Sequence, residues 1–335
     1  MTSVKPARGW GGIAALLLML AAGLGLVLIL VRPPTAQFVA GGTLGSTEVS
    51  GQTFPKCLLD PLGQGHTLSA PPQRIVSGIL AGDEMLAELV KPARLVGVTH
   101  LADAPGISNV AGHYPKSIAR IQAEVETMLA LRPDLVLVST HTNAITVRLL
   151  MRAGVAVARF AAFDSFAQIA DNIHTLGEIV GAPARAAAVV ANMQSRLAAI
   201  QQQVAGRPRP RVLYYSLSGN TGGPGSLTDE MLQLAGGYNV IRDTGITGYR
   251  RITPELAITL QPEVILMSGW SGGEGEATTK LLREDPAWQR VPAIQRNRVY
   301  ALRGGWVTSG SQFRVAGVAA VAELLHPEAF DDSPS

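Results

Sequence analysis

The feature that most constrains the fold of this chain is a 14-residue stretch that occurs twice. The first copy runs from Glu126 to Ser139 and the second from Glu255 to Ser268, 129 residues further along. Both copies begin with Glu, continue to a Leu, a polar residue, a Pro and an acid, and end as an apolar run closed by Ser. Proline disfavours helix at the residue before it, so each copy predicts a short helix followed by a strand. The continuous apolar run is typical of a parallel strand that is covered on both faces.

A unit that recurs at this distance predicts two similar α/β lobes rather than a short-period solenoid. In the first half, predicted strands alternate with helices, among them a helix starting near Asp83-Glu84, which favours a mostly parallel sheet. A helical pattern at 184–204 is about 30 Å long, enough to connect two lobes. We therefore expect two Rossmann-like lobes, at 53–182 and 207–328, joined by one long rigid helix at 183–206.

The chain begins with a membrane-directed segment. Residues 10–31 carry no charge and are long enough to cross a bilayer, and Lys5 and Arg8 precede them. We expect residues 1–32 to form a transmembrane anchor, with a cleaved signal peptide as the alternative, and 33–52 to form a flexible tether. Either form places the body outside the cytoplasm, in the periplasm or its equivalent.

Composition excludes several classes of protein. The net charge is +3 and the basic residues are dispersed, which gives no support for nucleic-acid binding. Cys57 is the only cysteine, so an intrachain disulfide and a Cys-rich zinc site are both excluded.

Ligands of parallel α/β lobes bind at the loops beyond the carboxyl ends of the strands. In this chain those loops are small, polar and rich in glycine, with a few large groups, which suits a binding cleft better than catalysis. The expected ligand contacts at these strand ends are Ser139, His141, Tyr215, Ser216, Trp270 and Trp306.

Two sequence patterns are compatible with other chemistry. Gly269–Gly273 matches the Gly-x-Ser-x-Gly pattern of hydrolases around Ser271, but the glycines after it are a poor helix start, so we expect no enzyme. His100, His113 and His141 lie in or near first-lobe loops and could hold a divalent metal, although no tight His spacing supports this. His141 alone could also be an axial ligand to a metal in a macrocycle.

Five segments, in this order, resemble the extracytoplasmic solute-binding proteins of ABC importers for ferric siderophores, haem and cobalamin. The resemblance covers about residues 53–328. The segments are Pro71–Ser77, Ala130–Leu137, Gly223–Gly237, Pro254-Glu255 with Gln261-Pro262, and Trp288 through Tyr300.

The resemblance implies a class III periplasmic-binding-protein fold that captures a metal chelate and delivers it to an ABC permease dimer with its ATPase. No cofactor is expected besides the ligand. Family members dock through one glutamate per lobe, and the matching residues here are Glu126 and Glu255. Glu84 resembles a recurrent family glutamate and Tyr249 an aromatic ligand position. Where some cobalamin-binding members have tryptophans after first-lobe strands, this sequence has Ser139 and the region of Arg120.

Two other functions of the same fold remain open at this point. One is a receptor for a free divalent metal, and the other is a membrane-tethered sensor or scaffold that presents the lobes to a partner other than a permease.

Overall fold

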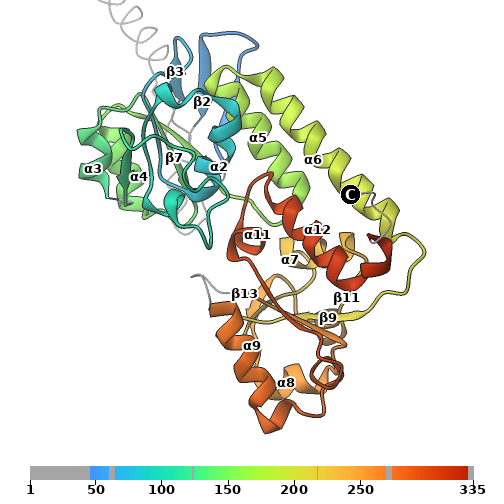
Figure 1. The fold of residues 1–335 in the computed structure, drawn as a ribbon. Coiled ribbons are helices and arrows are strands. Elements are labelled where there is room, and N and C mark those ends of the chain that lie inside the picture. Colours follow the sequence, from blue (N-terminus) through green and yellow to red (C-terminus); the bar gives the residue numbers. More distant parts are fainter. Residues whose placement is uncertain (1–45, 60–64, 123, 217, 269–273, 331–335) are drawn as a thin grey trace, which may run out of the picture. The chain divides into compact units, whose positions relative to one another are not determined.

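Two parallel β-sheets, each with helices packed against it, organise the chain (Figure 1). The computed structural model describes residues 46–59, 65–122, 124–216, 218–268 and 274–330, all within one unit of the chain, Thr43–Ser335. Within these ranges no helix is long and apolar enough to cross a membrane, and the apolar stretch at 10–31 lies outside them.

The first sheet has the strand order β6-β5-β4-β7-β8, with every neighbouring pair parallel. Its strands are β4 (Ile75–Ser77), β5 (Leu95–Thr99), β6 (Ala119–Ile121), β7 (Leu135–Ser139) and β8 (Ala156–Phe160). The helices of this lobe are α2 (Leu80–Leu89), η1 (Pro92–Arg94), η2 (His100–Asp103), α3 (Val125–Ala130), α4 (Ala144–Arg152) and α5 (Phe166–Val180).

The second sheet has the order β11-β9-β13-β14 and is also parallel throughout. Its strands are β9 (Arg211–Tyr214), β11 (Tyr238–Asn239), β13 (Val264–Ser268) and β14 (Val299–Leu302). An antiparallel pair, β10 (Asn220–Gly222) and β12 (Tyr249–Arg251), accompanies it. The helices are α7 (Leu227–Leu234), η3 (Val240–Thr244), α8 (Pro254–Thr259), α9 (Glu274–Glu284), η4 (Pro286–Trp288), α10 (Pro292–Gln295), α11 (Gly304–Thr308), α12 (Arg314–Leu325) and η5 (Pro327–Ala329).

A small antiparallel sheet of β1 (Glu48–Ser50), β2 (Lys56–Leu59) and β3 (Gly65–Leu68) precedes the first lobe. Its first strand lies within the stretch expected to be a tether. Thr47 donates its backbone N–H to the carbonyl of Arg159 at 2.9 Å, which ties this end of the chain to β8.

The longest described helix, α6 (Pro183–Val204), connects the two lobes. It packs along α5 and α2 on the side of the first lobe and against α7 and α12 on the side of the second (Figure 1). Its buried residues recur at steps of three and four, the spacing of one helix face, and are Ala186, Val190, Met193, Leu197, Ile200 and Val204. Because α6 is one uninterrupted helix, it is a stiff connection between the sheets.

Both copies of the repeat form a helix, a turn and a central strand: α3 and β7 in the first copy, α8 and β13 in the second. The residue before each proline has left-handed backbone dihedrals, with φ of 46° at Arg132 and 47° at Gln261. This conformation is uncommon for a residue other than glycine, and it ends the short helix abruptly so that the strand can begin at once.

The acid of each repeat holds the start of the neighbouring strand. Asp134 accepts the backbone N–H groups of Gln73 and Arg74 at 2.6 and 2.9 Å, just before β4. Glu263, its equivalent, accepts the N–H of Arg211 at 3.0 Å, at the first residue of β9. Charge-assisted bonds of this kind are stronger than bonds between neutral groups, so they set the alignment of adjacent strands.

The arginine at the start of each neighbouring strand completes the contact. Arg74 donates from Nη2 to the carbonyl of Leu131 at 2.7 Å, and Arg211 donates to the carbonyl of Leu260 at 2.9 Å. Leu131 and Leu260 are the matching leucines of the two copies. The Leu, Pro and acid of the repeat therefore have the same structural role in both lobes.

Helix α2 begins at Leu80, three residues before the predicted start, so Asp83 and Glu84 lie inside the helix and are fully buried. The carboxylate of Asp83 accepts the N–H of Thr99 at 3.2 Å and its hydroxyl proton at 2.5 Å, which links α2 to the end of β5. Burial outweighs these bonds and raises the pKa of Asp83 from 3.8 to about 8.

We predict that Asp83 makes the fold less stable as the pH rises. Because its pKa is higher in the folded state, its contribution is most favourable below about pH 4 and is lost as the pH approaches 8. Asp83→Asn has no titrating group at this position, so its free energy of unfolding should not show this decrease with pH. The slopes of the two proteins should differ by at most about 1.4 kcal/mol per pH unit. Urea denaturation of both proteins between pH 5 and 8 measures it, with the exposed Asp171→Asn as control. Parallel curves for wild type and Asp83→Asn would contradict the assignment.

Candidate functional site

A cleft of about 880 Å³ lies where the carboxyl ends of the two sheets face each other. First-lobe residues reach it from the loops after β7 and β8, and second-lobe residues from the ends of β9 and β13, from β10, β12 and α7, and from the segment between α11 and α12. Most lining side chains are small and polar. The cleft is lined by Thr140, His141, Ala161, Phe163, Asp164, Tyr214, Ser216, Ser218, Asn220, Thr221, Leu227, Thr228, Tyr249, Ser268, Val307, Thr308, Ser309, Gly310 and Arg314.

A second hollow of about 420 Å³ adjoins this cleft, with which it shares five residues, and extends it over the first sheet. It is formed by the residues that follow four strands of that sheet: Gly78–Ala81 after β4, His100 and Leu101 after β5, Gln122 after β6, and Ser139 with His141 at the end of β7. The location agrees with the rule for open parallel sheets.

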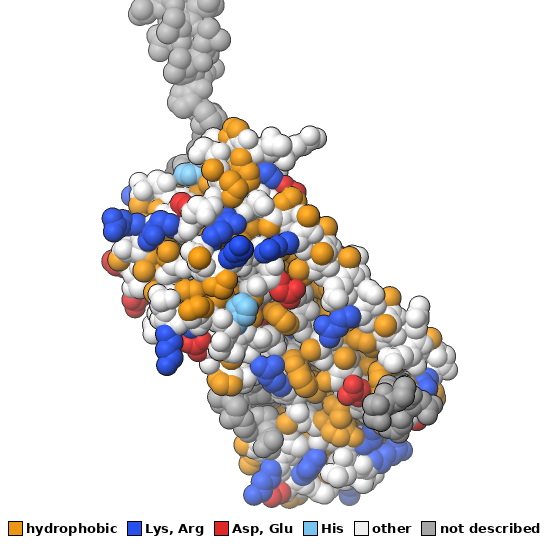
Figure 2. Space-filling view, turned by 45° about the horizontal axis from the view of Figure 1, so that its top comes forward, with side chains coloured by type: hydrophobic (Ala, Val, Ile, Leu, Met, Phe, Trp, Pro, Cys, Tyr) orange, Lys and Arg blue, Asp and Glu red, His pale blue; other side chains and the backbone are white. Residues whose placement is uncertain are grey.

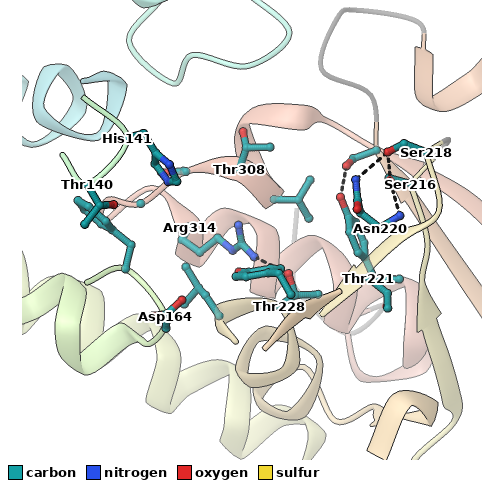
Figure 3. A pocket seen from close by; sticks show the side chains of 18 of the residues that line it. Thr140, His141, Asp164, Ser216, Ser218, Asn220, Thr221, Thr228, Thr308 and Arg314 are labelled. Atoms are coloured by element: carbon teal, nitrogen blue, oxygen red, sulfur yellow. Dashed lines mark hydrogen bonds between the residues drawn. The ribbon is translucent and has the colours of Figure 1, made fainter. Parts of the chain in front are cut away.

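The second-lobe wall is a hydrogen-bonded polar loop (Figure 3). Asn220 donates its backbone N–H to Ser216 Oγ at 3.0 Å and its amide Nδ2 to Ser218 Oγ at 2.7 Å. The two serine hydroxyls are 3.1 Å apart. These contacts hold neutral donors and acceptors toward the cleft.

Two tyrosines belong to the same wall, Tyr214 partly buried and Tyr249 exposed. The hydroxyls of Tyr214 and Ser268 are 2.5 Å apart at the ends of β9 and β13, and burial raises the pKa of Tyr214. Tyr249 on β12 is 49% exposed although it lines the cleft. An exposed aromatic side chain in a cleft is available to pack on a ligand.

Four of the expected ligand contacts line these hollows: Ser139, His141, Ser216 and Tyr249. Ser139 accepts the backbone N–H of His141 at 3.2 Å and so orients the loop after β7. His141 is exposed and borders both hollows.

The other expected contacts lie elsewhere. Tyr215 is buried and packs beside Trp288 with ring centroids 5.6 Å apart, because alternation along the strand turns it away from Tyr214 and the cleft. Trp306 is half-buried in α11, where its neighbours Val307 and Thr308 line the cleft. Trp270 and the rest of Gly269–Gly273, including Ser271, lie outside the described residues.

Glu84 does not line either hollow but connects the two lobes. One carboxylate oxygen accepts two bonds from Asn109, from its backbone N–H at 3.0 Å and its amide at 2.7 Å. The other oxygen accepts the hydroxyls of Ser309 and Ser311, from the segment between α11 and α12, at 2.6 and 2.7 Å. Arg303 strengthens the same contact by donating to Asn109 Oδ1 at 3.1 Å and to the carbonyl of Ser108 at 2.6 Å.

His100 and His141 line the same second hollow, but the three first-lobe histidines do not form a group of metal ligands among the described residues. His100 has its Nδ1 3.3 Å from the carbonyl of Ile121, and His113 packs edge-on against Tyr114. Among the described residues no three His, Cys, Asp or Glu side chains are grouped as metal ligands would be.

Glu126 and Glu255 are exposed in the first turns of α3 and α8. Bonds from its own backbone N–H and from Thr253 lower the pKa of Glu255, so it is ionised at neutral pH. On the face shown in Figure 2, Lys and Arg side chains form several separate groups with apolar and acidic side chains between them.

Sequence reasoning did not single out several cleft residues: Phe163, Asp164, Tyr214, Asn220, Thr221, Thr228 and Arg314. For Arg314, however, the helical spacing of the sequence does indicate a buried position. It precedes Val318, Val321 and Leu325 by four, seven and eleven residues, so it is placed on the core-facing side of the closing helix. A cation at such a position indicates either a buried partner or a ligand.

Two α/β lobes joined by a stiff helix, with a polar cleft between them, define the class of extracytoplasmic solute-binding proteins. A comparison with protein families agrees, because residues 75–304, more than half of the chain, match the model described as "Periplasmic binding protein". The chain therefore belongs to the periplasmic binding protein family, which confirms the resemblance noted in its sequence.

Individual relatives are similar over most of their length. A cobalamin-binding protein of Halobacterium salinarum is 29% identical over 282 residues, which cover 82% of this chain and 75% of the relative. An uncharacterised ABC transporter substrate-binding lipoprotein of Bacillus subtilis, YvrC, is 26% identical over 84% of this chain and 88% of its own length. The crystal structure of a periplasmic haem-binding protein from Pseudomonas aeruginosa aligns with a TM-score of 0.64 at 26% identity, over 76% of this chain and 93% of that one.

We predict that Glu84→Ala destabilises the fold by about 2–4 kcal/mol, because it removes the shared carboxylate acceptor of Asn109, Ser309 and Ser311, and the two serine hydroxyls are buried. Chemical denaturation measures the change. Glu323→Ala is the control, since Glu323 is an exposed helical glutamate on α12. Equal losses in the two variants would show that the Glu84 contacts do not stabilise the fold.

Proposed function

We propose that this protein is the substrate-binding component of an ABC importer and that its ligand is cobalamin. Membership of the periplasmic binding protein family supports the first part. The relative from Halobacterium salinarum, whose name is cobalamin-binding protein, supports the second. Family membership also favours binding over catalysis.

The observation that carries the choice of ligand is the neutral, polar lining of the cleft. Residues with a hydroxyl group predominate there, Asn220 adds an amide, and His141, Asp164 and Arg314 are the ionisable groups besides two tyrosines among the described lining residues. The corrin of cobalamin carries neutral amide side chains around its rim, and such groups are bound by donors and acceptors rather than by charges. Phe163 and Tyr249 supply aromatic surface for the ring itself.

The proposal includes docking on a permease through Glu126 and Glu255. Both carboxylates are exposed, and each begins one copy of the repeat. Since the two copies build the two lobes, the glutamates present matched charges to the two subunits of a permease dimer, where arginines would pair with them. A transmembrane helix at residues 10–31 would hold the protein beside that permease.

Haem and a ferric siderophore are the competing ligands. The haem-binding protein among the structural relatives is the reason to compare haem with cobalamin. No contact among the described residues favours a free-metal receptor or a tethered sensor over chelate binding.

Titration of the purified full-length chain tests the ligand. We expect cyanocobalamin to co-elute with the protein in gel filtration, seen by its visible absorption, and to bind more tightly than haemin or a ferric siderophore. Tyr249→Ala should weaken cyanocobalamin binding about tenfold, since it removes an aromatic contact of roughly 1–1.5 kcal/mol. Tighter binding of haemin, or no binding of cyanocobalamin, would refute cobalamin as the ligand.

Substitution of the docking glutamates separates binding from transport. We expect Glu126→Ala and Glu255→Ala to keep the affinity for cyanocobalamin within about twofold, because neither residue lines the cleft. Uptake by cells should fall, and the double variant should fall furthest. Glu323→Ala, an exposed glutamate on α12, is the control. Normal uptake by the double variant would exclude these residues as docking contacts.

A further inference from the structure

Arg314 is the first residue of α12 and the largest fully buried side chain of the described chain, with 1% of its surface exposed. It nevertheless lines the cleft. In the view of Figure 3 its side chain is drawn among the labelled lining residues, with Thr140 and His141 of the first lobe on one side and Thr221 and Asn220 of the second lobe on the other.

The charge of Arg314 has no counter-charge among the described residues. Its one hydrogen bond runs from Nη2 to Thr228 Oγ1 at 3.4 Å, and its Nε has no partner. Asp164 lines the same cleft but makes no ion pair with it. The ionisable groups that act on it are Tyr249 and Tyr214, and tyrosine hydroxyls are neutral at physiological pH. A buried cation without a partner is costly, so its retention at this place calls for a counter-ion from the cleft.

A second unsatisfied group lies in the same wall. Thr221 Oγ1 is buried, has no hydrogen-bond partner and also lines the cleft. Thr221 and Thr228 therefore add two hydroxyl groups to the cleft wall that contains Arg314, and the hydroxyl of Thr228 contacts the guanidinium directly (Figure 3). Guanidinium and hydroxyl donors around one point are the groups that bind phosphate and carboxylate oxygens.

We propose that Arg314, Thr221 and Thr228 form a subsite for an anionic oxygen group of the bound ligand, a phosphate or a carboxylate. The subsite rests on the proposed function in one respect, namely that the ligand occupies this cleft. If the ligand is cobalamin, the group is the phosphodiester of its nucleotide loop. If it is haem, the group is a propionate carboxylate.

Inorganic phosphate tests the subsite without reference to the whole ligand. At 50 mM phosphate we expect the melting temperature of the wild-type chain to rise by about 2 °C over chloride at equal ionic strength, for a dissociation constant of roughly 10 mM. Arg314→Met should abolish the rise. It should not lower the stability, because an apolar side chain of similar length replaces an unpaired buried charge.

The control is Arg148→Met, which removes an exposed arginine of α4 that does not line the cleft and should keep the full rise. Thr221→Val and Thr228→Val each remove a hydroxyl with almost no change in side-chain shape. Each should reduce the phosphate-induced rise in melting temperature, so these variants test the subsite if Arg314→Met does not fold. A rise that is absent in the wild type, or equal in wild type and the substituted chains, overturns the subsite.

Matched probes identify the source of the anion. A tenfold or greater loss of cyanocobalamin affinity in Arg314→Met, with no change for dicyanocobinamide, assigns the phosphodiester, since cobinamide lacks the nucleotide loop. A loss for haemin but not for its dimethyl ester assigns a carboxylate. If cyanocobalamin does not bind while phosphate protection depends on Arg314, the proposed ligand is wrong and the subsite stands. If cyanocobalamin binds and phosphate protection is independent of Arg314, the ligand stands and the subsite is wrong.

Discussion

The contact on which both lobes depend is a carboxylate that accepts the backbone N–H at the start of the neighbouring strand. Asp134 makes it to Gln73 and Arg74, and Glu263 makes it to Arg211. Each contact aligns the two adjacent strands at the centre of one sheet. Since parallel strands aligned at one end are also aligned at the other, it places the loops at the opposite end, where the cleft lies.

The cleft itself combines two kinds of recognition. Its walls carry neutral hydroxyl and amide groups held by bonds within one loop, as Asn220 is to Ser216 and Ser218. Arg314 adds a single positive charge in the wall. Neutral groups tolerate variation around the rim of a large ligand, whereas an unpaired buried charge rejects any ligand that leaves it without a partner. In the proposed subsite, Arg314 is thus the residue whose pairing a ligand must provide.

Sequence patterns predicted the parts of this structure that follow from local rules. The repeat, the parallel strands, the linking helix and the loops around the cleft all depend on proline placement and apolar periodicity. Patterns did not predict which side chains turn inward. Asp83 and Glu84 have the composition of a helix start, yet three earlier residues already form the first turn and carry both acids into the interior.

The direction of a side chain was also the reason that the predicted ligand contact at Tyr215 was wrong. Tyr214 and Tyr215 are adjacent, and only the position of the sheet decides that the first faces the cleft and the second faces the core. Thr221 and Thr228 look like ordinary turn and helix residues, yet β10 and α7 place them in the same cleft wall as Arg314, where Thr228 contacts its guanidinium. Contacts between elements distant in sequence are set by tertiary packing, which no local pattern records.

Ser309 takes part both in the lining of the cleft and in the contact between the two lobes. Ser309 borders both hollows, and its hydroxyl donates to Glu84 of the other lobe. A residue that borders the cleft is therefore held by a buried carboxylate of the other lobe. A substitution at Glu84 would change the support of the cleft wall without removing any side chain that lines the cleft.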